Sequence, residues 1–185
     1  MSAPEPLTLA GAEIPRVEPQ AAPWRLDLSD ARYTWPTSFA FAWAARCVAC
    51  WRLGALPLYA CTDPPEFGVT ARQWERMGLV DVAVVMAATL HGDRALLRLP
   101  EAIVRARHAQ DVDLLDAVGD CEPETAATAD LVGLGLIEEH RDDILALGRL
   151  LEARGALFAE ALAVFAVERG LMHRPRPLLL ALASP

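Results

Sequence analysis

Apolar residues recur at helical spacing through most of the chain after residue 36. Between residues 37 and 54, one face carries Phe39, Trp43, Cys47, Cys50 and Gly54. Steps of three and four residues place these side chains on one side of a helix, which predicts a helix with a buried face. Thr37 or Ser38 can cap its first free N–H groups, and Gly54 is typical of a helix end.

The same pattern predicts further helices at about 71–79, 80–90, 94–118, 124–137 and 142–169. Residues 80–90 are rich in β-branched side chains, so a buried strand is the alternative there. The last helix carries a seam of Ile144, Leu147, Leu151, Phe158, Leu162 and Phe165. Residues 55–69 contain the pair Pro64-Pro65, which forbids a helix and predicts a loop.

The two ends of the chain differ from this helical pattern. Residues 1–35 are rich in proline and show no sustained period, which predicts a partly extended arm whose pieces "LTLAG" and "WRLDL" form short strands. Residues 173–185 form an apolar tail after "HRPRP". We therefore expect an all-α fold: a single helical domain of five or six helices over residues 36–172, with an N-terminal arm and a C-terminal tail.

Composition narrows the classes of function. The net charge is −8, and all 17 basic residues are arginine, so lysine Schiff-base chemistry and a P-loop lysine are excluded. The arginines form no basic run, which argues against nucleic-acid binding. Arg46 and Arg52 interrupt the most apolar segment, and the N-terminus has no secretory pattern. We therefore expect a cytoplasmic protein that does not insert into a membrane.

His91, Gly92 and Asp93 follow an apolar run and offer two interpretations. Histidine beside aspartate is common in hydrolytic sites, but no nucleophile or second ligand follows at a known spacing. Alternatively, His91 and Gly92 end one helix and Asp93 caps the next. The second interpretation is preferred and predicts a corner between two helices.

Two cysteines and one further histidine are also candidates for a redox or metal site. Cys47 and Cys50 have the CxxC spacing of redox and metal sites, yet they lie within a predicted helix between Trp43 and Trp51. Buried cysteine behaves as a small apolar residue, so we expect a structural role. His140 lies in "EEHRDD", where a carboxylate metal site is the alternative to a helix junction capped by Asp142 or Asp143. We expect no cofactor and no catalytic residue.

Tryptophan is concentrated in the first 74 residues. Trp24 and Trp35 flank the arm, and Trp74 follows the proline-rich loop. Exposed tryptophans are frequent at the centres of protein interfaces. We predict that Trp24, Trp35 and Trp74 contribute to partner binding.

One segment resembles a known family. "ERMGLVDVAVVMAATLHGDRALLRLPEAIVRARHAQDVDLLDAVGD", residues 75–120, is similar to the central part of the SctK (YscK-type) accessory proteins of bacterial type III secretion. The resemblance covers about a quarter of the chain. It implies a helical adaptor that links the cytoplasmic sorting platform to the membrane-embedded ring, and it transfers no catalytic residue.

The sequence thus predicts a non-enzymatic helical adaptor in a bacterial protein assembly, associated through its partners with a membrane-bound complex. A small immunity or chaperone-like protein that binds one partner is the first alternative. A metal or thiol enzyme using Cys47, Cys50 and His91 is the second.

Overall fold

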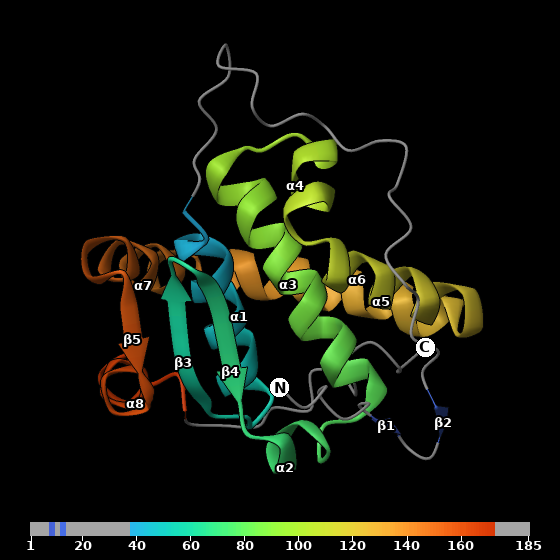
Figure 1. Ribbon diagram of the computed structural model, residues 1–185, viewed down its shortest axis with the longest axis horizontal. Coiled ribbons are helices and arrows are strands. Elements are labelled where there is room, and N and C mark those ends of the chain that lie inside the picture. The colour runs from blue at the N-terminus through green and yellow to red at the C-terminus, as the bar shows by residue number, and fades with distance from the viewer. Residues whose placement is uncertain (1–7, 10–11, 14–37, 173–185) are drawn as a thin grey trace, which may run out of the picture. The chain divides into compact units, whose positions relative to one another are not determined.

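The computed structural model describes residues 8–9, 12–13 and 38–172 (Figure 1). The chain divides into two units, residues 1–32 and 33–185. In the first unit, β1 (Thr8–Leu9) pairs with β2 (Ala12–Glu13) in an antiparallel hairpin. The expected strand in "LTLAG" is therefore confirmed in part, whereas "WRLDL" lies outside the described residues.

Helix α1 (Ala40–Arg52) is the centre of the second unit. All but one of its residues are buried, because α3 and α7 pack against it along its length and β3 contacts it as well. Figure 1 shows α1 lying behind the small sheet. Cys47, Cys50 and Trp51 are part of the main core, and the indole of Trp43 donates a hydrogen bond of 2.8 Å to the Cys61 carbonyl.

Helices α2 (Ala71–Trp74) and α3 (Leu79–Leu97) follow the sheet. The Thr70 side chain accepts from the Gln73 N–H and caps α2. Helix α3 packs on α1 and α6. Gly92 lets α1 approach, because a Cβ there would lie 2.7 Å from the Ala45 Cβ and 3.2 Å from the Phe41 carbonyl oxygen.

The predicted corner at His91, Gly92 and Asp93 is wrong. All three residues lie inside α3 and are buried, and the helix continues to Leu97. Arg98 then takes a left-handed conformation with φ of 54° and ends the helix. Packing of α1 over Gly92 explains the glycine, which the sequence pattern had assigned to a helix end.

The second half of the unit is helical but divided differently from the prediction. The expected helix 94–118 is the end of α3 followed by two shorter helices, and the expected helix 142–169 stops at Gly155, whose φ is +72°. The helices are α4 (Glu101–Arg107), α5 (Ala109–Cys121), α6 (Pro123–Glu139), α7 (Arg141–Arg154) and α8 (Ala159–Glu168). His140 precedes α7, so Asp142 and Asp143 are in its first turn and do not cap it.

Residues 55–69 form a hairpin, which corrects the predicted loop. β3 (Pro57–Thr62) pairs with β4 (Pro65–Val69), and the cis Asp63–Pro64 bond lies in the turn between them. β5 (Ala156–Phe158) completes an antiparallel sheet of order β4-β3-β5. Prolines stand at strand starts and in the turn, where no ladder hydrogen bond is lost. Ala60 and Leu157 face the core.

The fold is therefore mostly helical but not all-α, and the described residues contain eight helices instead of five or six. Of the predicted seam, Ile144, Leu147, Leu151 and Leu162 are fully buried, whereas Phe158 is exposed on the sheet. None of the described helices is long and apolar enough to cross a membrane.

Candidate functional site

A groove of about 580 Å³ lies between α3, α4, α5 and α6. Its floor is apolar, because the facing turns of α3, α5 and α6 carry small or aliphatic side chains. The floor residues are Ala87, Leu90, Val112, Leu115, Gly119 and Ala126. Small residues on α6 and α5 leave this space open where larger side chains would close it.

Charged side chains form the rim of the groove. They are Arg94, Glu101, Arg105, Asp116, Asp120 and Asp130. Arg94 pairs with Glu101, and Arg105 contacts Asp116 at 2.7 Å. Asp130 lies 2.9 Å from Nε2 of His91. These paired arginine and carboxylate side chains are 41% to 66% exposed, so the rim is open to water along the groove.

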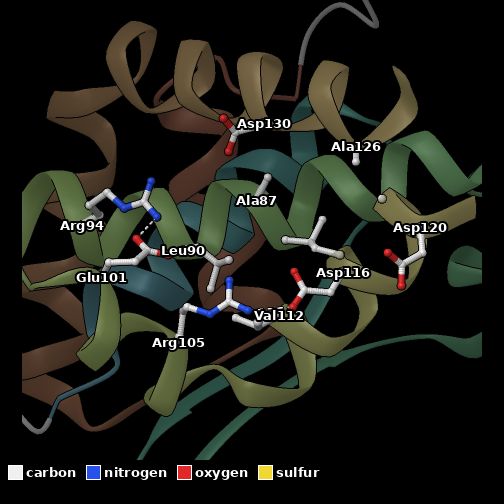
Figure 2. Close-up of a pocket in the computed structure, with 12 residues that line it drawn as sticks. Ala87, Leu90, Arg94, Glu101, Arg105, Val112, Asp116, Asp120, Ala126 and Asp130 are labelled. Carbon is white, nitrogen blue, oxygen red and sulfur yellow. Dashed lines mark hydrogen bonds and ion pairs between the residues drawn. The ribbon is translucent and has the colours of Figure 1, made fainter. Parts of the chain in front are cut away.

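The rim is uneven in charge. In Figure 2 the Arg94–Glu101 pair lies at one end of the groove and Asp120 lies at the other, with Arg105 and Asp116 along one edge and Asp130 on the opposite edge. The first end is balanced in charge. The second end is acidic, because Asp120 has no ion pair within the described part of the chain.

A buried ion network holds the helices that line the groove. Asp93 on α3 accepts from Nε of Arg107 at 2.9 Å and lies 2.9 Å from Nε2 of His108, at the junction of α4 and α5. The Arg107 guanidinium also donates to the Ser38 carbonyl at 2.8 Å. The Asp93 side chain is 0% exposed and that of His108 is 1% exposed, so solvent does not reach either group.

A second part of the network joins α5 to α1. Arg46 on α1 donates to Asp111 on α5 and to the hydroxyl of Thr89 on α3 at 2.9 Å. The guanidinium also lies over the Trp43 ring, 4.9 Å from its centroid. Buried charges need partners of this kind, because unpaired charges are expensive in the interior. The network therefore fixes α3, α4 and α5 relative to α1, and with them one side of the groove.

Aspartate and histidine in contact are also the parts of a general base, which makes the Asp93–His108 pair a candidate catalytic site. Both side chains are buried, and the rings of Phe39 and Trp43 pack edge-on against the His108 imidazole. A general base must reach the proton that it removes. We assign the pair to the positioning of helices.

Cys47 and Cys50 are fully buried in α1. Burial raises the pKa of the Cys50 thiol to about 12, with Arg46 opposing the effect. Burial, reinforced by the Cys50 charge and opposed by Arg46, raises the pKa of Cys47 well above its usual range. Reactive cysteines have a lowered pKa and access to solvent, so these thiols have the properties of core residues.

The structure separates the other sequence candidates. Trp74 is half-buried and packs against the core, whereas Trp24 and Trp35 lie outside the described residues. His91 pairs with Asp130, and His140 lies 3.6 Å from Glu139 and from Asp143. No group of three or more His, Cys, Asp or Glu side chains in the described ranges could hold a metal ion.

Sequence reasoning missed the groove, although one signal for it was present. Residues 109–139, which span α5 and α6, contain nine acidic residues and no arginine. A local run of one sign marks a surface more clearly than the total charge does.

Comparison with family models, with curated proteins and with solved structures finds no match to this chain. The groove and its chemistry are therefore the basis for assigning a function.

Proposed function

We propose that this protein is a non-enzymatic helical adaptor that binds a protein partner in the groove between α3 and α6. The observation that carries the proposal is an open groove with an apolar floor and an exposed charged rim. Protein interfaces combine these two parts, since the centre excludes water and the rim stays solvated. Because residues 75–120 resemble SctK proteins, we propose that the adaptor works in the sorting platform of a type III secretion apparatus in the cytoplasm.

Exposed apolar side chains also occur outside the groove, on β5 and α8, where a second partner could bind. Phe158 in β5 is 64% exposed, and Val164 and Val167 on α8 are exposed as well. Exposed apolar residues that gather on one surface are typical of interaction sites. Helix α8 contacts β3 and β5, whereas the groove is lined by α3 to α6, and Figure 1 shows α8 at the left of the unit and α5 and α6 at the right.

A steric block tests the groove. Ala126→Trp places a large ring on the groove floor at a half-buried position near the start of α6. Ala127→Trp is the matched control, because Ala127 is exposed on the same helix and does not line the groove. The full-length protein and both variants are used to capture partners from the native host, with mass spectrometry of the retained proteins.

We expect the wild type and Ala127→Trp to retain several secretion-apparatus proteins and Ala126→Trp to lose at least one of them. Retention of one dominant partner would instead favour the immunity or chaperone-like protein. Unchanged capture by Ala126→Trp, with its fold intact, would remove the groove as the binding site. Stoichiometric metal in the purified protein would favour the metal enzyme.

A further inference from the structure

The excess of acidic over basic residues in this protein lies in one pair of helices. Residues 109–139 hold nine of the 25 acidic residues and none of the 17 arginines, so the rest of the chain is nearly neutral. These residues are α5 and α6, joined at Glu122, and the two helices contribute Asp116 and Asp130 to opposite edges of the groove. The field over the groove is therefore negative, and most of it comes from this pair of helices.

Both arginines of the rim are ion-paired, so neighbouring carboxylates already neutralise their positive charge. The guanidinium of Arg94 contacts Glu101, and that of Arg105 contacts Asp116. The acidic end keeps Asp120, and Asp130 has the imidazole of His91 as its one partner among the residues that the structure describes. A ligand in the groove thus meets aliphatic side chains below, the Asp120 carboxylate at one end and the Asp130 carboxylate on one edge.

We propose that the groove takes a basic amphipathic helix of a partner protein, with its apolar face on the floor and its Arg or Lys side chains over Asp120 and Asp130. This inference rests on the proposed function and names the chemistry of the partner. Helices recognise grooves of this kind through apolar anchors three and four residues apart. Long basic side chains fit the arrangement, because their stems cover apolar surface while their charges reach the rim.

Charge complementarity decides between occupants. A nucleic acid or a phosphate ligand would be repelled by the same carboxylates that attract arginine and lysine. A second copy of this chain would bring its own charge of −8 toward an acidic surface. A basic helix gains attraction at the acidic end, and this attraction steers its approach.

Three synthetic peptides test the partner chemistry on the full-length protein. They share one apolar face of leucine and alanine at helical spacing, and their polar faces carry lysine and arginine, glutamine, or glutamate. Binding is measured by fluorescence anisotropy of a label on each peptide at low and moderate salt. We expect the basic peptide to bind at least about tenfold more tightly than the glutamine peptide at low salt, and the glutamate peptide to bind most weakly.

Reversing one charge on the protein gives a matched pair of variants. Asp120→Arg changes the acidic end of the groove, whereas Glu152→Arg makes the same change at an exposed position on α7 that does not line it. Asp120→Arg is expected to weaken the basic peptide by about tenfold and to flatten its salt dependence. Glu152→Arg is expected to leave its affinity within about twofold of the wild type.

The outcomes separate this inference from the proposed function. If all three peptides bind equally well and Ala126→Trp blocks them all, the preference for a basic partner is overturned. The groove then remains a binding site. Binding of the basic peptide that resists both Ala126→Trp and Asp120→Arg would place it elsewhere and overturn the inference. Tighter binding of the glutamate peptide would also overturn it, because the field of the groove would then be of the wrong sign.

Discussion

Asp93 is the side chain on which the buried ion network depends. It faces both Arg107 and His108, and its other carboxylate oxygen has no hydrogen-bond partner within the described residues. We predict that Asp93→Asn lowers the free energy of unfolding by about 3 to 5 kcal/mol, because it leaves buried positive charge without its counter-ion. Urea unfolding followed by circular dichroism measures the change.

Asp113→Asn is the control for this prediction. Asp113 is exposed on α5, so its substitution is expected to change stability by no more than about 0.5 kcal/mol. A loss below about 1 kcal/mol in Asp93→Asn would contradict the assigned role. A neutral amide would then satisfy Arg107 and His108 as well as the carboxylate does.

The four cysteines have different environments, and their reaction with a thiol reagent near neutral pH reports on them. Cys121 is exposed, Cys61 is half-buried, and Cys47 and Cys50 are buried with raised pKa values. We predict that Cys121 reacts first, Cys61 later, and the α1 pair only when the protein unfolds. The thiolate is the reactive form, and burial disfavours it.

Cys121→Ser is expected to remove the fast phase alone. Rapid modification of Cys47 or Cys50 in the folded protein, located by peptide mass spectrometry, would contradict the core assignment. It would also return the thiol enzyme to consideration.

At the scale of elements, close contact between helices depends on glycine. A Cβ at Gly92 would meet Ala45 and the Phe41 carbonyl of α1, whereas a Cβ at Gly135 on α6 would have no atom within 4 Å. We predict opposite effects of the same substitution. Gly92→Ala should lose about 1 to 3 kcal/mol through overpacking, and Gly135→Ala should gain about 0.5 to 1 kcal/mol through helix propensity.

Thermal and urea unfolding of both variants test this pair. If Gly92→Ala were as stable as Gly135→Ala, α1 and α3 would not be in the close contact described.

Gly92 also shows which features of the fold the sequence pattern could predict and which it could not. The periodic apolar positions located the helix that became α1 and the buried residues of α7. They could not show that Gly92 faces another helix, because helix ends and close crossings both favour glycine. Pro64-Pro65 likewise excluded a helix but did not distinguish a loop from a hairpin, since prolines are also found in turns and at the ends of strands.

The groove was hidden for a related reason. Its floor consists of Ala, Gly, Leu and Val at spacings that also suit a closed core. Only the meeting of α3, α4, α5 and α6 decides which of these side chains stay uncovered. The charge run over residues 109–139 is the part of the site that the sequence does contain.

At the scale of the whole molecule, this charge run should oppose folding. Nine carboxylates held on α5 and α6 repel one another more strongly than in the unfolded chain, where they are farther apart. Raising the salt concentration shortens the Debye length from about 30 Å at 0.01 M to about 8 Å at 0.15 M. We predict that the free energy of unfolding rises over this range of sodium chloride.

Exposed ion pairs act in the opposite direction, but each contributes only about 0 to 1 kcal/mol, and the buried network is screened little. Neutralising Asp113 and Asp120 together by Asn should therefore raise stability at low salt and reduce its dependence on salt. Neutralising Glu66 and Glu152, which lie outside this pair of helices, should do neither. Stability that falls as salt is added would mean that ion pairs outweigh the repulsion, and the acidic end of the groove would then be weaker than a basic partner requires.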